Sequence, residues 1–213
     1  MPTEKSFKIR SKHNDLFLRV VKGHFATSHS HINYYIDVTP LKTNLDDARR
    51  IGRDLSSYYI ASTLVDTVLC LDGTEVIGTC LARELTREHF ASINMQQPIS
   101  IITPEHTTGS QLIFRDNLVP NVTGKDVLVL AASVTTGYTA QAAAEAIRYY
   151  GGRVAGICAI FATLDTCSGI PVNSIFNPND LKDYISFPSH ECPLCKQGKK
   201  IDALVNSYGY SRL

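Results

Sequence analysis

The sequence predicts an α/β domain with a central, mostly parallel sheet flanked by helices, and three observations support this. Apolar runs at Thr67–Leu71, Val127–Leu130 and Arg153–Phe161 are typical of strands buried on both faces. Segments with helical patterning alternate with these runs. The chain has 213 residues, of which 44% are hydrophobic, so it can form one such domain with a small appendage.

The composition excludes some classes of partner. The formal net charge is +1 and 19% of the residues are charged, so no electrostatic signal for nucleic acid or membrane binding is present. The N-terminal stretch MPTEKSFKIRSKHND is polar and lacks the apolar segment of a signal peptide. We therefore expect a cytoplasmic protein, in which the six cysteines stay reduced unless they bind metal.

The N-terminal part predicts two helices separated by a loop and a strand. Apolar residues in Asp15–Val21 have near-helical spacing, and Gly23 follows them as a helix stop. His24–Val38 is expected to be an irregular loop that ends in a strand at Tyr34–Val38. Asn44 is a favourable N-cap for a helix over the segment LDDARRIGRDLSSYYIAST, which has two acids in its first turn.

The rest of the chain predicts alternating elements up to an irregular tail. A turn at Asp72–Glu75 precedes a helix from about Val76 to Leu85, and Gly151 closes a helix over Ala140–Tyr150. From Ile170 onward the sequence is expected to be irregular. Short strands are predicted at Ala91–Asn94, Ser100–Thr103 and Gln111–Arg115.

The stretch VLVLAASVTTGYT, Val127–Thr139, combines a buried strand, a small-residue turn and a helix start. Backbone N–H groups at such a turn, with threonine hydroxyls beside them, can surround a phosphate dianion. The alternative is an ordinary strand-to-helix turn with threonine caps. The residues of this predicted phosphate loop are Val134, Thr135, Thr136, Gly137, Tyr138 and Thr139.

The same stretch resembles the signature of type I phosphoribosyltransferases, which is an apolar strand, two adjacent acids, two variable residues and a Thr/Gly turn. Ala131 and Ala132 stand where the acids would be. The segments GHFATSHSHINYYIDV, DTVLCLDGTEVIGTCLAREL and SQLIFRDNLVPNVTGKDVLVL resemble the orotate branch of this family, in the same order along the chain. FPSHECPLCKQG resembles the CPLC tail of a bacterial and archaeal subgroup. The resemblance extends over roughly residues 15 to 200.

This resemblance implies a type I phosphoribosyltransferase fold with a small hood. The hood would comprise about residues 1–40 and 170–213, and the core about residues 41–169. It also implies a homodimer and Mg²⁺-dependent use of phosphoribosyl pyrophosphate. The implied pyrophosphate loop is Asp72, Gly73 and Thr74, for which an ordinary Asp-Gly turn is the alternative. The implied base pocket comprises Phe25, Ser28, Tyr35 and Gln141.

Three departures from the family pattern bear on activity. The family's acids contact ribose hydroxyls, and the methyl groups of Ala131 and Ala132 accept no hydrogen bond, so the ribose site is degenerate. Gln141 lacks the charge of the arginine often found near this point. The loop Pro104–Ser110 offers His106 but no lysine, and Arg115 is either a displaced basic group or a solvated strand end.

Two groups of residues raise the possibility of metal binding. His190, Cys192 and Cys195 resemble part of a zinc knuckle, although a reduced, metal-free pair is the alternative. His24, His29 and His31 have no ligand spacing typical of a helix or knuckle. For these three histidines the sequence favours pocket lining or plain surface over metal binding.

Three functional hypotheses follow. The first is an orotate phosphoribosyltransferase-like protein that binds a sugar phosphate or nucleotide, with transfer activity weakened or lost. The second is an active transferase that uses Mg²⁺, in which Asp72, Glu75 or a partner subunit compensates for the missing acids. The third is a structural or partner-binding domain.

Overall fold

The computed structural model describes residues 6–11, 15–88, 90–107, 111–206 and 209–213. Its contacts divide the chain into two compact units. The hood unit consists of the described residues up to Leu41 and from Phe176 onward, and the core unit consists of residues 42–175. The two ends of the chain therefore contribute to the same unit.

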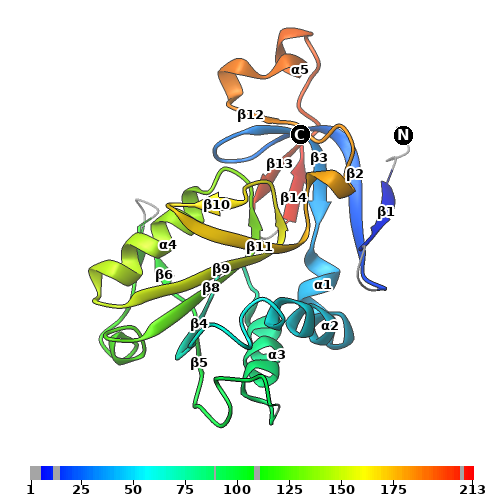
Figure 1. Ribbon diagram of the computed structural model, residues 1–213. Helices are drawn as coiled ribbons and strands as arrows, with labels where there is room; N and C mark the ends of the chain where they lie inside the picture. Colours follow the sequence, from blue (N-terminus) through cyan, green and yellow to red (C-terminus); the bar gives the residue numbers. More distant parts are fainter. Residues whose placement is uncertain (1–5, 12–14, 89, 108–110, 207–208) are drawn as a thin grey trace. The chain divides into compact units, whose positions relative to one another are not determined.

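The core unit is built on a sheet with the strand order β10-β11-β9-β8-β4-β5 (Figure 1). The neighbouring strands β9, β8, β4 and β5 pair in parallel, and β10 pairs with β11 in antiparallel fashion. The strands are β4 (Thr67–Cys70), β5 (Ser100–Ile102), β8 (Asp126–Val134), β9 (Arg153–Ala162), β10 (Thr166–Cys167) and β11 (Ile170–Phe176). A short antiparallel pair, β6 (Glu105–His106) with β7 (Leu112–Ile113), and the 3-10 turn η1 (Val119–Asn121) precede β8.

Helices cover both faces of this sheet, as Figure 1 shows for α4 on one side and for α2 and α3 on the other. From β4 the chain crosses through α3 to β5, and from β8 it crosses through α4 to β9, in the opposite direction along the sheet. Because such crossovers are right-handed, the two helices must lie on opposite faces. The helices are α2 (Leu45–Ser56), α3 (Glu75–Thr86) and α4 (Tyr138–Tyr149).

Close packing of apolar strands and helices fixes this unit. Residues 127–132 of β8 are all buried, and Phe161 of β9 is fully buried. Gly78 of α3 lies so close to β4 that a Cβ atom there would be 2.4 Å from the Cys70 sulfur. Cys70 of β4 and Cys158 of β9 are fully buried and pack as small apolar residues in this core.

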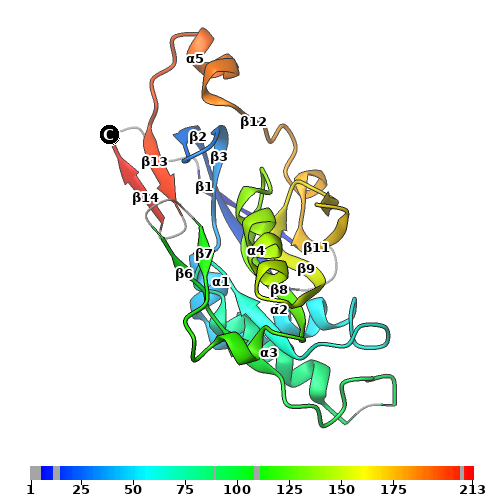
Figure 2. The same ribbon diagram turned by 90° about the vertical axis from the view of Figure 1, so that its left-hand side faces the viewer.

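The hood unit contains a second sheet with the strand order β12-β3-β2-β13-β14, to which β1 adds through β2 (Figure 2). Its small apolar cluster includes Phe25, Ile32, Tyr35 and Ala203. The strands are β1 (Ser6–Arg10), β2 (Phe17–Ala26), β3 (His31–Asp37), β12 (Ser186–Phe187), β13 (Ala203–Asn206) and β14 (Gly209–Arg212). The tail adds η2 (Pro178–Asp180), η3 (Ser189–Glu191) and α5 (Pro193–Lys196), and α1 (Thr39–Thr43) leads into the core unit.

Three predicted elements are wrong. In the segment Asp15–Val21, residues 17–21 belong to strand β2 and form no helix, because the buried Leu16, Leu18 and Val20 alternate with exposed residues at the spacing of a strand. Ala91–Asn94 forms no strand; it is a loop. The side chain of Asn94 fixes that loop, since its Oδ1 accepts from the Val65 N–H at 2.9 Å and its Nδ2 donates to the Thr63 carbonyl. From Ile170 onward the described residues form the strands β11, β12, β13 and β14, so the tail is not irregular.

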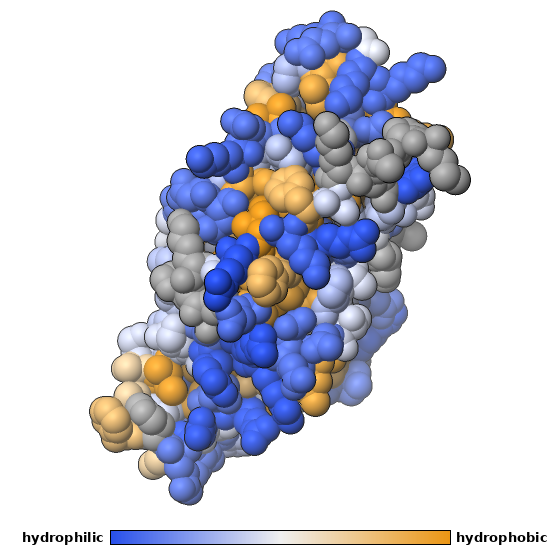
Figure 3. Space-filling model, turned by 90° about the vertical axis from the view of Figure 1, so that its right-hand side faces the viewer, coloured by the Kyte–Doolittle hydropathy of each residue, from blue (hydrophilic) through white to orange (hydrophobic). Residues whose placement is uncertain are grey.

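The prediction of an irregular loop from His24 up to a strand at Tyr34 is also wrong, because β2 continues to Ala26 and β3 begins at His31. Several other predicted elements are confirmed. Asn44 caps α2 by accepting from the N–H groups of Asp46 and Asp47, although α2 ends at Ser56, before the predicted segment does. α3, β8, α4 and β9 lie within a few residues of their predicted bounds. No helix in the described part of the chain has the length and apolarity needed to cross a membrane. Figure 3 shows one face of the molecule, on which hydrophilic residues predominate around small hydrophobic patches.

Candidate functional site

The carboxyl ends of β4 and β8 lie side by side at one edge of the core sheet. The strand order reverses between these two strands, since the chain continues from β4 to one side of the sheet and from β8 to the other. These strands pair in parallel, with Cys70 opposite Leu130, while the crossover after β4 runs in the opposite direction from the one after β8. At such a point two loops separate to opposite faces, and a ligand-sized crevice commonly lies between them. The loop after β4 and the loop after β8 are the two loops that the sequence predicts to bind anions.

The loop Val134–Thr139 leads directly from β8 into α4. Gly137 is the N-cap of α4 and has a φ of 81°, in the left-handed region that glycine adopts without a steric penalty. Thr136, Tyr138 and Thr139 are exposed. The first N–H groups of a helix have no acceptor within the helix, so they point toward any anion that binds there.

Hydrogen bonds from the segment after β9 hold this loop in place. The Thr163 hydroxyl donates to the Thr135 carbonyl at 2.7 Å, and the Thr163 N–H donates to the Val134 carbonyl at 2.9 Å. The Cys167 thiol donates to the Gly137 carbonyl at 3.6 Å. The loop is therefore shaped by the protein itself before any ligand binds, which lowers the entropic cost of binding.

Ala131 and Ala132 lie within β8, and their exposed fractions are 1% and 4%. Ala131 belongs to the apolar cluster that contains Ala140 and Ala143 of α4. The backbone N–H of Ala132 donates to the carboxylate of Asp72. Neither methyl group presents a hydrogen-bonding atom or appreciable surface to a ligand.

The loop Asp72–Thr74 is a tight turn with two consecutive left-handed residues, Asp72 at φ 58° and Gly73 at φ 75°. Thr74 is fully buried, and its hydroxyl donates to the Leu71 and Leu130 carbonyls at 2.8 and 3.1 Å. The side chain of Thr74 therefore stabilises the turn and is not presented to a ligand. The exposed Gly73 contributes backbone only.

Burial raises the pKa of Asp72 above the ordinary value of a carboxyl group. The Lys42 ammonium, the N–H of Ala132 and the His106 ring offset part of this effect. Lys42 is itself buried, with 8% of its surface exposed, and donates to the backbone carbonyl of Asp72. The sequence analysis did not identify Lys42, because it lies 30 positions before the loop that it contacts.

Two other predicted site residues, Gln141 and Arg115, hydrogen-bond to acidic side chains of the protein. Gln141 is exposed and donates to Glu145 at 2.9 Å, one turn along α4. Arg115 forms two hydrogen bonds of 2.6 Å to Glu105 in the β6–β7 pair, which lowers the pKa of that carboxyl group. The end of the predicted flexible loop, residues 108–110, lies outside the described residues.

Of the three predicted base-pocket residues in the hood unit, two are buried and one is exposed. Phe25 and Tyr35 are buried in its apolar cluster, with ring centroids 6.1 Å apart, whereas Ser28 is exposed. Burial, with the nearby Asp37 carboxylate as the next cause, raises the pKa of Tyr35 to about 12. Phe25 and Tyr35 therefore serve as core residues of this unit.

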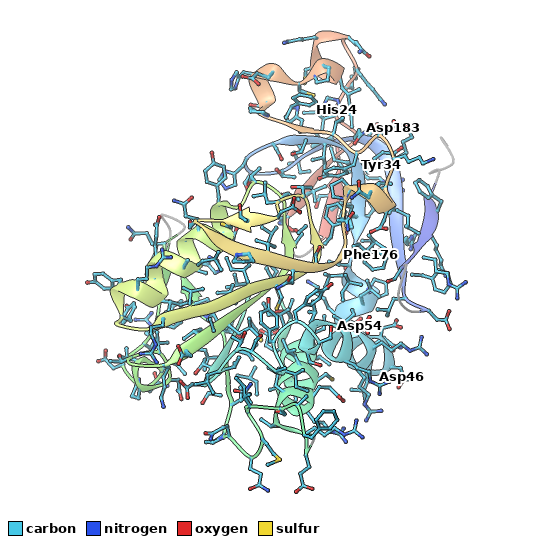
Figure 4. The ribbon with its side chains drawn as sticks, viewed as in Figure 1. His24, Tyr34, Asp46, Asp54, Phe176 and Asp183 are labelled. Atoms are coloured by element: carbon cyan, nitrogen blue, oxygen red, sulfur yellow. The ribbon has the colours of Figure 1, made fainter. Side chains whose placement is uncertain are left out.

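A second group of candidate ligand side chains lies within the hood unit. His24, His31, Cys192 and Cys195, hereafter the His/Cys cluster, offer ligand atoms that all lie within 4.8 Å of one another. His24 comes from β2 and His31 from β3, while the cysteines flank the start of α5. Figure 4 labels His24 where the β2–β3 hairpin meets the tail segment that contains α5.

The membership of this group corrects the predicted ligand set. His190 is outside it, and its Nε2 lies 3.3 Å from the Glu191 carboxylate on the exposed part of the tail. His24 has no exposed surface, so the interpretation of His24 as a surface residue is wrong. His29 is exposed and also lies outside the group. The sequence contains both halves of the cluster, but only the fold brings them together.

Comparisons with known proteins agree with this architecture. A structure of the Mycobacterium tuberculosis orotate phosphoribosyltransferase superimposes with a TM-score of 0.53 at 21% identity, covering 77% of this chain and 92% of that one. Leishmania donovani adenine phosphoribosyltransferase gives 0.51 at 14% identity, covering 76% and 78%. The chain has the type I phosphoribosyltransferase fold. The Mycobacterium enzyme has also been solved with 5-phospho-α-D-ribosyl 1-diphosphate (TM-score 0.51, 20% identity, 70% and 83% covered).

Sequence comparison points to the orotate branch. The chain is 25% identical over 187 residues to the orotate phosphoribosyltransferase of Chlorobaculum parvum, covering 86% of this chain and 88% of that protein. It is 26% identical over 183 residues to that of Heliobacterium modesticaldum, covering 84% and 87%. No protein-family model matches the chain. The relatives and the fold together support the resemblance to orotate phosphoribosyltransferases.

Proposed function

We propose that this phosphoribosyltransferase-like protein binds a sugar phosphate or a nucleotide through the loop Val134–Thr139, with phosphoribosyl transfer weakened or lost. The observation that carries the proposal is the left-handed Gly137 at the start of α4, held in place by hydrogen bonds from Thr163. This geometry places the first N–H groups of α4 and the exposed, hydroxyl-bearing Thr136 and Thr139 together at the helix start, where anions bind favourably. The phosphoribosyl diphosphate bound by a solved neighbour of the same fold is a ligand of this class.

The weakened transfer is inferred from the end of β8. The buried alanines 131 and 132 cannot hold ribose hydroxyls, and interactions that strengthen in the transition state would be lost with them. At roughly 1.5–3 kcal/mol for each hydrogen bond to a charged group, two lost contacts reduce the rate by orders of magnitude. Phosphate binding can remain tight, because it depends on the loop Val134–Thr139 and not on the side chains at positions 131 and 132.

This edge offers fewer oxygen donors to the Mg²⁺ that the fold implies than a pair of acids at the end of β8 would. Mg²⁺ requires oxygen ligands, and the alanines supply no side-chain oxygen. The described carboxylates near the two loops are those of Asp72 and of Glu75, the first residue of α3, which accept hydrogen bonds from the Ala132 N–H and the Thr103 hydroxyl. The reduced donor set is a second reason to propose weakened transfer.

One observation favours the alternative of an active transferase. The carboxylate of Asp72 reaches the backbone of Ala132, so an acid from the neighbouring strand end lies beside the position that lost its own. If Asp72 replaced the missing acid, Asp72→Asn would abolish transfer. A protein that only binds would tolerate the same change, because asparagine keeps a hydrogen-bond acceptor and adopts the left-handed conformation well.

Isothermal titration calorimetry with ribose 5-phosphate, uridine monophosphate and orotidine monophosphate tests the binding proposal. The double variant Thr136→Val, Thr139→Val removes the two exposed hydroxyls and is expected to weaken binding by about a hundredfold or more, from the loss of two hydrogen bonds to a charged group at roughly 1.5–3 kcal/mol each. Thr123→Val is the matched control. Thr123 is exposed and precedes β8 at the amino edge of the sheet, so its loss leaves affinity unchanged.

A pyrophosphate-release assay with phosphoribosyl pyrophosphate, Mg²⁺ and orotate separates the two functions. Slow or absent release together with phosphate-dependent binding supports the proposal. Rapid release that is lost in Asp72→Asn would establish the active transferase instead. If the chain bound none of the phosphate ligands, both the binding function and the transferase function would be excluded.

A further inference from the structure

We infer that the His/Cys cluster is a structural zinc site, in which one Zn²⁺ is bound by His24, His31, Cys192 and Cys195. This site lies in the hood unit and is independent of the proposed phosphate loop in the core unit. Two histidines and two cysteines are one of the common ligand sets of structural zinc. Four protein ligands fill a tetrahedron and leave no position open for chemistry, so the role inferred is structural.

The spacing of the ligand atoms matches a tetrahedron of the size that zinc requires. Zn–N bonds of about 2.05 Å and Zn–S bonds of about 2.3 Å give ligand-to-ligand edges of roughly 3.3 Å for N–N and 3.6 Å for N–S. His24 Nε2 and His31 Nδ1 are 3.2 Å apart, and Cys192 Sγ lies 3.5 Å from His24 Nε2. Cys195 Sγ lies 3.7 Å and 3.2 Å from the same two nitrogens.

The surroundings of His24 orient its ring for metal binding. Its Nδ1 lies 2.9 Å from the Lys199 carbonyl and 3.2 Å from the Lys200 carbonyl. A carbonyl oxygen only accepts, so Nδ1 must hold the proton and Nε2 presents a lone pair to the other three ligand atoms. A carbonyl that fixes the tautomer of a histidine in this way is the usual outer partner of a zinc ligand.

The tail segment around the cysteines has almost no apolar core to stabilise it. Between Pro188 and Asp202, a stretch that the structure describes throughout, Cys192 is the one residue classed as buried. α5 contains four residues, which is too short to be stable alone. The segment folds back so that the Asp202 carboxylate accepts from the backbone N–H of His24 at 2.7 Å. A metal that joins α5 to the β2–β3 hairpin supplies the stabilisation that apolar burial does not.

The chemistry of the thiols agrees with zinc as the occupant. Cys192 and Cys195 are both free, so no disulfide competes for them. Thiolate sulfur and imidazole nitrogen together favour zinc over Mg²⁺ or Ca²⁺, which prefer oxygen. Zinc is also redox-inactive, as a purely structural role requires.

The test uses the full chain, purified without chelator, with its metal content measured by plasma mass spectrometry. We expect about one zinc per chain, the stoichiometry of a four-ligand site. Cys195→Ser and His31→Ala each remove one ligand that is not fully buried, and both are expected to lose most of the zinc. His190→Ala is the matched control, because His190 is exposed on the same tail but lies outside the cluster.

Two further measurements on the wild-type chain avoid any dependence on variant folding. Cobalt(II) added to the zinc-free chain should give the intense visible bands of a tetrahedral site and a sulfur-to-cobalt charge-transfer band. Trypsin should cut at the exposed Lys196, Lys199 and Lys200 at least tenfold faster after zinc is removed. A folded wild-type chain that binds neither metal, or zinc loss in His190→Ala equal to that in Cys195→Ser, would overturn the assignment.

Discussion

The loop Val134–Thr139 of the core unit, the proposed phosphate loop, and the His/Cys cluster of the hood unit differ in how they are stabilised. The loop lies at the end of β8, most of which is buried, and backbone geometry with a few hydrogen bonds fixes its shape. The cluster joins a hairpin to a tail segment whose residues are mostly exposed, through polar ligand atoms. The first region owes its order to apolar packing, and we expect the second to owe its order to a metal.

This difference predicts that the two regions respond to different perturbations. β8 and α4 are held by apolar packing in the core unit, so we expect their stability to be unchanged when a metal is lost from the hood unit. α5 and its flanking tail bury little surface, so we expect them to be unaffected by changes in the apolar core of the core unit. Loss of the metal-binding side chains should destabilise them. Four measurements test whether the two regions respond differently.

Metal removal is expected to have the largest effect. When a chelator strips zinc from the chain, amide hydrogen exchange over residues 188–202 should accelerate by about two orders of magnitude or more, because that segment loses its main stabilising contact. Exchange in β8 and α4 should stay nearly constant. Equal acceleration in both regions would show that the metal stabilises the whole chain, and no acceleration would remove its structural role.

Phe161→Ala tests the apolar core of the core unit. Phe161 is fully buried, and truncation of a buried phenylalanine costs about 3–5 kcal/mol of unfolding free energy. Urea denaturation measures this loss, and the zinc content should not change. The control is Tyr149→Ala on α4, where 85% of the side chain is exposed and the expected change is within about 0.5 kcal/mol.

Gly137→Ala tests the left-handed N-cap of α4. An alanine at φ 81° costs about 1–2 kcal/mol, and its Cβ would lie 3.0 Å from the Leu164 side chain. We expect a comparable loss of stability together with weaker phosphate binding, measured by denaturation and calorimetry.

Gly124→Ala is the matched control for this change. It has a φ of 71°, and no atom lies within 4 Å of the added Cβ, so it introduces similar backbone strain away from the loop. Its phosphate affinity should match that of the wild type. If both variants bound phosphate equally well, the loop Val134–Thr139 would not be the binding site.

Asp72→Asn is expected to have the smallest effect on stability, and one that depends on pH. The folded-state pKa of Asp72 is raised above its ordinary value of 3.8, so the protonated form is the more stable one in the folded chain. The stability that it contributes is complete below about pH 3.8 and is lost as the pH rises through the raised value. Asp72→Asn should therefore match the wild type in acid and be slightly more stable at neutral pH, as thermal denaturation across this range would show. A variant less stable than the wild type at neutral pH would contradict this assignment.

The accuracy of the sequence predictions follows the range of the interactions involved. The capped helix α2 and the strand–turn–helix around Gly137 were predicted correctly because their signals lie within a few residues. The segment at Asp15–Val21 was wrongly predicted as a helix, since in so short a segment its apolar residues are compatible with either period. The loop near Asn94 was missed because a buried side-chain amide, whose partners lie about 30 positions away, determines its shape.

By itself the sequence determined the alternating fold, the strand–turn–helix at Val127–Thr139 and the alanines at the end of β8, because these properties belong to consecutive residues. Only the tertiary structure placed Lys42 against the turn at Asp72 and brought His24 to the cysteines, which are 168 and 171 positions away. Their meeting depends on strand pairing and on the path of the tail. Such contacts are set by the packing of distant segments, which no local spacing encodes.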